Sequence, residues 1–287
     1  MKPHFPLLII LALTSRAHSQ TILRDIPYTP NSTDKLQTLD IYSPKDAKNL
    51  PVLFWIHGGG WQTGDKSEVK TKPQFFNDHG YVFVSTNYRL LPKVDMATLT
   101  RDVASAFAFV HSHIADHGGD PHRILVAGHS AGAQLAALLC TDEKYLAGNH
   151  IPFTDLKACI PVDGDTYDIP AIIELAETRW RLHHMPPQKF GHREKFGNDP
   201  ALHRDFSAVY HVAEHKNIPP FLILYVAGHP DTSAQAFRLA TVLKEAHIPT
   251  STFAAQETTH NKLNDDLGQP NDPATKALSD FLADSIK

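Results

Sequence analysis

One segment constrains the fold more than any other. Residues 123–139 read RILVAGHSAGAQLAALL, an apolar stretch that passes through Gly128-His129-Ser130-Ala131-Gly132 into a stretch rich in Ala and Leu. A short apolar run bounded by glycine is typical of a buried strand, and Ala and Leu favour a helix. A chain that turns sharply from strand to helix needs small residues on both sides of the turn. The segment therefore predicts a buried strand, a tight turn that exposes Ser130, and a helix.

The rest of the chain repeats this alternation of strand and helix. Amphipathic or Ala-rich stretches separate further apolar runs, for example MATLTRDVASAFAFV after the second run and SAQAFRLATVLKEAH before the last. Continuous apolar runs are typical of strands that are buried on both faces of a sheet. These runs lie at 52–57, 81–88, 158–164, 220–228 and 250–256. The pattern predicts an α/β fold with a mostly parallel central sheet and helices on both faces.

The stretch from about 166 to 215 breaks the rhythm. It shows no clear strand, it contains the polar, proline-bearing sequence HHMPPQKFGHREKFGNDP, and it is too long for a plain loop. We expect a small, partly helical insertion over the C-terminal edge of the sheet, within one domain that spans residues 20–287. Six of the 19 histidines lie in this stretch, but their spacing does not match a metal site, so we expect no bound metal.

The N-terminal residues, the net charge and the cysteines bear on the protein's location and partners. Residues 1–19 contain Lys2, a short apolar run and Ala17-His18-Ser19, a pattern that predicts a signal peptide cleaved before Gln20. The apolar run is too short for a stable membrane span, so we expect a secreted or periplasmic protein. The net charge of −4 gives no basic surplus for nucleic acid. Cys140 and Cys159 fall in separate apolar elements, and we expect two unbonded thiols.

Ser130 needs a base to act as a nucleophile, and the base needs an orienting acid. In a strand–turn–helix arrangement of this kind the order along the chain is Ser, then acid, then His. Asp231 follows the run that ends at 228, and His260 follows the run that ends at 256. Alternative acids are Asp163 and Asp165, which follow an earlier strand. Glu257 is a weaker alternative because it shares a loop with the histidine. The prediction is a triad of Ser130, Asp231 and His260.

Three consecutive glycines follow the first apolar run, in HGGGW at 57–61. Acyl transfer builds negative charge on a carbonyl oxygen, which backbone N–H groups can stabilise if no side chain intervenes. We expect Gly59, Gly60 and Ala131 to donate these N–H groups, although the sequence leaves open which amides of the glycine loop do so. We expect His57 to orient the loop by hydrogen bonds. A bulky residue at Gly59 should lower turnover more than stability.

Together the motifs HGGGW, GDK, TNYRLLP, GGDPHRILVAGHSAG, GHPD and THNKLNDDLG resemble the α/β-hydrolase superfamily. More narrowly, they resemble the esterase branch that carries an HGGGW motif and includes carboxylesterases, feruloyl or acetyl esterases and kynurenine formamidases. The resemblance covers about residues 25–287. It implies an α/β-hydrolase fold, Ser130 as nucleophile, His260 as base, Asp231 as acid, and no cofactor.

The function that follows is an exported serine hydrolase acting on carboxylic esters. We expect short acyl, acetyl or feruloyl esters, either as small molecules or linked to a polysaccharide. One alternative is an amidase such as an arylformamidase, and a second is a non-catalytic binding protein on a hydrolase scaffold. The oligomeric state and the acyl specificity do not follow from the sequence.

Overall fold

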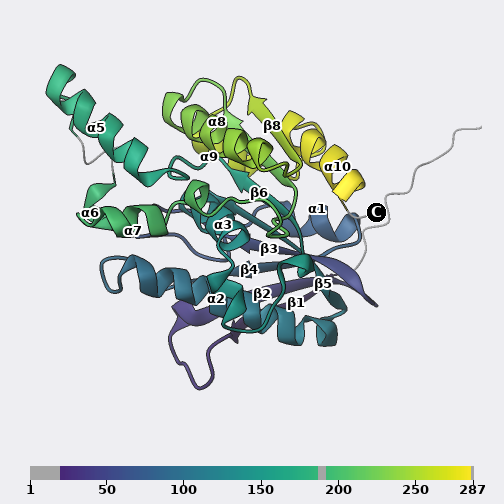
Figure 1. Ribbon diagram of the computed structural model, residues 1–287. Coiled ribbons are helices and arrows are strands. Elements are labelled where there is room, and N and C mark those ends of the chain that lie inside the picture. Colours follow the sequence, from purple (N-terminus) through teal and green to yellow (C-terminus); the bar gives the residue numbers. More distant parts are fainter. Residues whose placement is uncertain (1–19, 187–191, 286–287) are drawn as a thin grey trace, which may run out of the picture.

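The computed structural model describes residues 20–186 and 192–285, and in these residues it contains one sheet of eight strands (Figure 1). The strand order is β1-β2-β4-β3-β5-β6-β7-β8. β1 and β2 pair antiparallel at one edge, and β2 pairs antiparallel with β4. From β4 onward every pairing is parallel. The strand bounds are β1 Gln20–Pro27, β2 Thr38–Pro44, β3 Leu50–Ile56, β4 Val82–Thr86, β5 Gly119–His129, β6 Leu156–Val162, β7 Phe221–Val226 and β8 Thr250–Ala255.

Helices cover both faces of the sheet, which explains why central strands such as β3 are apolar on both faces. In β3, Phe54 and Ile56 pack into one core with α2 (Met96–His113), α3 (Ala131–Thr141) and α8 (Pro230–Glu245). Leu53 and Trp55 point to the other face and pack with α1 (Lys72–Asp78), α9 (His260–Asp266) and α10 (Pro273–Ser285). The predicted α/β fold with a mostly parallel sheet is confirmed.

The stretch from 166 to 215 is partly helical, as expected, and lies between β6 and β7. Its elements are α5 (Ile169–His183), α6 (Arg193–Phe196), α7 (Pro200–Asp205) and η5 (Ala208–Tyr210). α5 extends away from the sheet (Figure 1). α6 packs onto the glycine loop, because the Trp61 ring meets Phe196 and His192 edge-on at centroid distances of 5.1 and 5.3 Å.

The predicted signal peptide, residues 1–19, lies outside the described residues. Within the described part of the chain, none of the helices combines the length and the apolar character that a membrane crossing requires. Cys140 and Cys159 are free and buried, as expected. They are not packed separately, however, because both lie in the same core cluster. Burial, and then a hydrogen bond with Cys140, raise the pKa of the Cys159 thiol.

Candidate active site

Ser130 occupies a strained turn between β5 and α3. Its φ and ψ are 56° and −119°, a conformation that a residue with a side chain rarely adopts. A Cβ atom on Gly128 would lie 2.3 Å from the carbonyl oxygen of Gly132, and a Cβ on Gly132 would lie 2.1 Å from that of Ile56. Larger residues at either glycine would therefore force the backbone apart. The tight turn and its need for small neighbours are as the sequence predicted.

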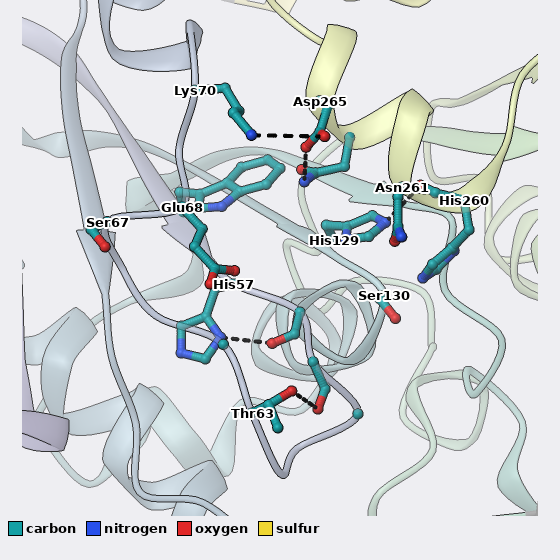
Figure 2. A pocket seen from close by; sticks show the side chains of 16 residues that line it. His57, Thr63, Ser67, Glu68, Lys70, His129, Ser130, His260, Asn261 and Asp265 are labelled. Atoms are coloured by element: carbon teal, nitrogen blue, oxygen red, sulfur yellow. Dashed lines mark hydrogen bonds and ion pairs between the residues drawn. The ribbon is translucent and has the colours of Figure 1, made fainter.

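Ser130 lines a cavity of about 840 Å³ that also contains His260 and the glycine loop (Figure 2). The cavity lies at the carboxyl ends of the parallel strands, where ligands bind in open α/β sheets. Much of its wall is polar. The polar or charged lining side chains away from the predicted triad include Thr63, Ser67, Glu68, Lys70, Asn261, Asn264 and Asp265.

His260 is the first residue of α9, and its ring is held by a carboxylate. Its Nδ1 donates a hydrogen bond of 2.7 Å to Oδ2 of Asp163, whose side chain is fully buried. The other oxygen of Asp163 accepts the N–H of Val226 at 2.9 Å. Burial alone would raise the pKa of Asp163, but hydrogen bonds from His260, Val226 and Thr232 outweigh it and lower this pKa below 3.8. With the proton on Nδ1, Nε2 of His260 can accept a proton from a hydroxyl group.

The prediction that Asp231 orients His260 is wrong. α8 begins at Pro230, so Asp231 lies in the first helical turn and faces α5. Its two oxygens accept hydrogen bonds of 2.9 and 2.5 Å from the guanidinium of Arg179. Asp163 instead directly follows β6 with a φ of 50°, and its carboxylate reaches His260. The acid thus follows the strand before the one that the sequence indicated.

Among the described residues, neither of the other two acids considered from the sequence forms a hydrogen bond or ion pair with His260. Asp165 pairs with Nε2 of His192 at 3.0 Å and so joins the 166–215 stretch to the sheet. Glu257 is exposed. Of the three alternatives, only Asp163 meets the geometric requirement for an orienting acid.

The glycine loop runs directly against the serine. A Cβ on Gly58 would lie 3.1 Å from Cβ of Ser130. The carbonyl of Gly59 turns back into the loop and accepts the N–H groups of Gln62 and Thr63, both at 3.1 Å. Among the described residues, the N–H groups of Gly59 and Gly60 donate to no backbone carbonyl. The first N–H groups of a helix such as α3, which begins at Ala131, also have no partner within the helix. The roles of Gly59, Gly60 and Ala131 as oxyanion donors stay a prediction.

Gly59 is a poorer test position than the sequence suggested. Its φ is +108°, and a Cβ there would lie 2.1 Å from the carbonyl oxygen of Thr63. A bulky residue at Gly59 would therefore disrupt the loop itself, and stability would fall together with turnover. Gly60 has a φ of +59°, and its added Cβ would meet only Nζ of Lys195, at 3.5 Å.

Two buried histidines form hydrogen bonds to backbone carbonyls of the site. Nδ1 of His57 donates to the carbonyl of Gly58 at 2.7 Å, and its ring stacks on Tyr88 with centroids 4.4 Å apart. Nε2 of His129 donates to the carbonyl of His260 at 3.1 Å. Burial lowers the pKa of His57 to about 4, and burial next to His260 lowers that of His129 to about 3. Both rings are neutral at pH 7, and the expected hydrogen bond from His57 to the glycine loop is confirmed.

Lys72 is a supporting residue that the sequence did not reveal. Its side chain is buried, and Nζ donates a hydrogen bond of 2.5 Å to the carbonyl of Asn264 in α9. Nζ also lies 4.9 Å from the centroid of the Trp55 ring. Burial lowers the pKa of Lys72 to about 7. This lysine links α1 to the helix that carries His260, and only its position before Pro73 marks it in the sequence.

Known proteins that are similar to this chain include named esterases. A family model described as BD-FAE matches residues 39–238. Esterase LipQ of Mycobacterium tuberculosis is 30% identical over 268 residues, which are 90% of this chain and 61% of that protein. The probable carboxylic ester hydrolase LipM of the same organism is 36% identical over 137 residues, which are 45% of this chain and 32% of that protein. The chain thus spans less than two thirds of the length of these two relatives.

Solved structures share the fold at low sequence identity. Esterase B from Lactobacillus rhamnosis superposes with a TM-score of 0.73 at 21% identity, covering 92% of this chain and 84% of that one. A truncated carbohydrate esterase from gut microbiota gives a TM-score of 0.72 at 19% identity, covering 94% and 98%. The family model covers well over half of the chain. The chain therefore belongs to the BD-FAE family, in the HGGG-type esterase branch of the α/β-hydrolase superfamily.

Proposed function

We propose that this protein is a serine hydrolase that cleaves carboxylic esters through an acyl-enzyme on Ser130. One observation carries the proposal: Ser130, on its strained turn, shares a cavity with His260, whose Nδ1 is held 2.7 Å from the buried Asp163. A serine, a histidine and a buried acid in this relation form a nucleophile, a base and an orienting group. The names of LipQ and LipM support the same reaction class.

The reaction follows from the positions of these groups. The hydroxyl oxygen of Ser130 attacks the ester carbonyl and its proton passes to Nε2 of His260. Ionised Asp163 stabilises the imidazolium, and backbone N–H groups of the glycine loop and Ala131 bind the oxyanion. The C–O bond to the alcohol then breaks, and the alcohol leaves with the proton from His260. Water, deprotonated by His260, then attacks the acyl carbonyl. The C–O bond to Ser130 breaks, His260 returns the proton to the serine oxygen, and the acid leaves.

We infer that the substrates are short-chain esters, such as acetyl or feruloyl esters, with a polar alcohol part. Carboxylate, ammonium and amide groups of Glu68, Lys70 and Asn261 line the cavity beside Ser130 and suit hydroxyl groups better than a long alkyl chain. The name of one structural neighbour, the carbohydrate esterase from gut microbiota, supports this choice of substrates. Comparing the turnover of acetylated xylan, methyl ferulate and long-chain p-nitrophenyl esters tests this choice of substrates. Faster turnover of the long-chain esters would contradict it.

Labelling with a fluorophosphonate probe, together with p-nitrophenyl acetate hydrolysis, tests the mechanism. Ser130→Ala should abolish labelling and lower kcat by at least about 10⁴-fold. Ser67→Ala is a matched control, because Ser67 lines the same cavity without a role in the reaction. Full activity in Ser130→Ala would overturn the proposal, and absent labelling of the wild type would favour a binding protein. Preferential turnover of formyl-kynurenine would favour an amidase instead.

We also propose that the protein is exported after cleavage before Gln20. The pattern of residues 1–19 supports this proposal. Expression of the full chain followed by N-terminal sequencing of the extracellular or periplasmic protein provides the test. A protein that stays in the cytoplasm with Met1 retained would contradict it.

A further inference from the structure

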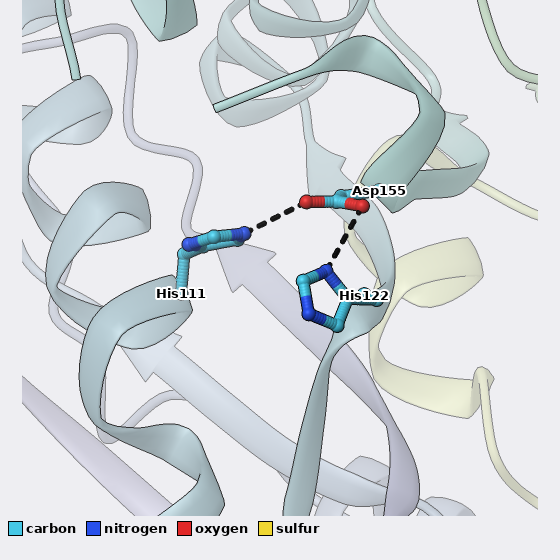
Figure 3. Close-up of side chains that lie close together, drawn as sticks. All are labelled: His111, His122 and Asp155. Carbon is cyan, nitrogen blue, oxygen red and sulfur yellow. Dashed lines mark hydrogen bonds and ion pairs between the residues drawn. The ribbon is translucent and has the colours of Figure 1, made fainter. Parts of the chain in front are cut away.

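Two histidines and one aspartate meet at the end of the sheet opposite to the active site (Figure 3). His111 comes from the last turn of α2, His122 from the first part of β5, and Asp155 from η3 (Phe153–Asp155), which leads into β6. β5 and β6 are parallel, and Ser130 and Asp163 directly follow their carboxyl ends. The cluster therefore lies at the amino ends of the same two strands, and the proposed ester hydrolysis does not use it.

The three side chains lie close enough to one another to share one ion. Nε2 of His111 lies 2.9 Å from Oδ2 of Asp155, and Nδ1 of His122 lies 3.2 Å from Oδ1 of the same carboxylate. The ligand atoms of all three residues lie within 4.8 Å of one another. Tetrahedral Zn²⁺ with bonds of about 2.0–2.1 Å separates its ligand atoms by about 3.4 Å. Small side-chain movements would therefore admit the ion.

Charge and exposure also suit a cation. The side chain of Asp155 is only 10% exposed, and among the described residues no lysine or arginine forms an ion pair with it. A buried carboxylate without a permanent cation is costly unless a positive charge can bind. His122 is 70% exposed on its side chain, which leaves a path for the ion and room for water as a fourth ligand.

A second cluster shows what distinguishes the first. Asp142, Asp205 and His211 also bring their ligand atoms within 4.8 Å of one another. There, however, Nζ of Lys144 lies 2.8 Å from Oδ2 of Asp142 and also pairs with Asp205. An ammonium group already supplies the positive charge in that cluster. Of these two clusters of described residues, the one around Asp155 offers carboxylate and imidazole without a competing lysine.

We propose that His111, His122 and Asp155 form a Zn²⁺ site that ties α2 to the starts of β5 and β6. Two imidazoles and one carboxylate are a ligand set that Zn²⁺ prefers, with water completing the tetrahedron. In the metal-bound form, each imidazole is neutral: the nitrogen that faces Asp155 is unprotonated and coordinates the ion, and the other ring nitrogen carries the proton. The ion stabilises the fold, because it binds the folded chain and not the unfolded one. This role is independent of the reaction at Ser130.

Calorimetric titration of the metal-free, untagged full chain with Zn²⁺ tests the site. We expect one saturable equivalent in the wild type, and binding at least about 10-fold weaker in His122→Gln and Asp155→Asn. His122→Gln is the safer variant for folding because that side chain is mostly exposed. His113→Gln changes an exposed histidine of the same helix outside the cluster, and His211→Gln changes the second cluster. Both should bind Zn²⁺ like the wild type.

Thermal unfolding adds a second readout. Zn²⁺ should raise the Tm of the wild type, His113→Gln and His211→Gln, and it should leave the Tm of His122→Gln unchanged. Co²⁺ bound by the wild type should show the visible absorption of a tetrahedral site. The proposal is overturned if the wild type binds no saturable equivalent, or if His122→Gln and Asp155→Asn bind Zn²⁺ as tightly as the wild type.

Discussion

Asp163 and Asp231 are both buried carboxylates that follow neighbouring parallel strands, yet only one of them reaches a histidine. Asp163 accepts hydrogen bonds from His260 and the N–H of Val226. Asp231 accepts two from Arg179. The difference arises in the turn after each strand, because β6 is followed at once by a residue with positive φ, whereas β7 leads within a few residues into α8. Position after a strand is therefore a weaker guide to a catalytic acid than the path of the next few residues.

The largest expected effect separates the two acids by kinetics. Asp163→Asn should lower kcat for p-nitrophenyl acetate by about 10⁴-fold, because the amide no longer holds His260 in the correct tautomer. Asp231→Asn should retain kcat within about 10-fold, since its partner is Arg179. Steady-state kinetics of the two purified variants decide the matter. A larger loss in Asp231→Asn than in Asp163→Asn would restore the assignment made from the sequence.

A second prediction concerns His57, which has no carboxylate partner among the described residues, in contrast to His260 with Asp163. Nε2 of His57 is buried and has no hydrogen-bond partner among the described residues, and burial lowers the pKa of His57 to about 4 from an unfolded value of 6.5. Between these pH values the unfolded chain binds more protons, so this contribution to stability is complete above pH 6.5 and is lost as the pH falls toward 4. At about 1.4 kcal/mol per pH unit, the loss is roughly 3 kcal/mol.

Urea unfolding between pH 7 and pH 4 measures this loss. The free energy of unfolding of His57→Gln should depend less steeply on pH than that of the wild type. Equal slopes in the two proteins would show that His57 is not held neutral by burial.

The Arg179–Asp231 pair should matter for stability rather than for catalysis. Arg179→Met leaves the carboxylate of Asp231, whose side chain is 3% exposed, without its cation. We expect a loss of about 1–3 kcal/mol, below the range for fully buried pairs because the arginine is partly exposed. Chemical denaturation of Arg179→Met, Asp231→Asn and the double variant isolates the pair's interaction free energy. Strict additivity of the two single changes would contradict a direct interaction.

The smallest effect concerns acid conditions. Hydrogen bonds keep the pKa of Asp163 below its ordinary 3.8. A depressed pKa means that the stabilisation by ionised Asp163 is present above about pH 4 and is lost as the pH falls through the lowered value. The difference in the free energy of unfolding between wild type and Asp163→Asn should therefore shrink as the pH falls below 4. A difference that stays constant down to pH 3 would argue against the ionised pair.

Much of the fold could be predicted because its signals are local. The apolar runs at 52–57 and 123–128 became β3 and β5, and the helix after Ser130 became α3. These elements depend on side-chain periodicity and on the steric demands of one turn. The partner of His260 could not be predicted in the same way, because 97 residues separate it from Asp163. Lys72 likewise reaches Asn264 across 192 residues.

The sequence by itself determined the strand–turn–helix segment around Ser130, since only small residues at Gly128 and Gly132 allow that turn. It also determined a sheet covered on both faces, since its central strands are apolar on both sides. The tertiary structure alone decided which acid orients His260 and which polar residues meet at the far end of the sheet. His111, His122 and Asp155 come from three elements, so their approach depends on how α2 and η3 pack against β5. Local sterics select the elements, whereas long-range packing selects the partners of charged side chains.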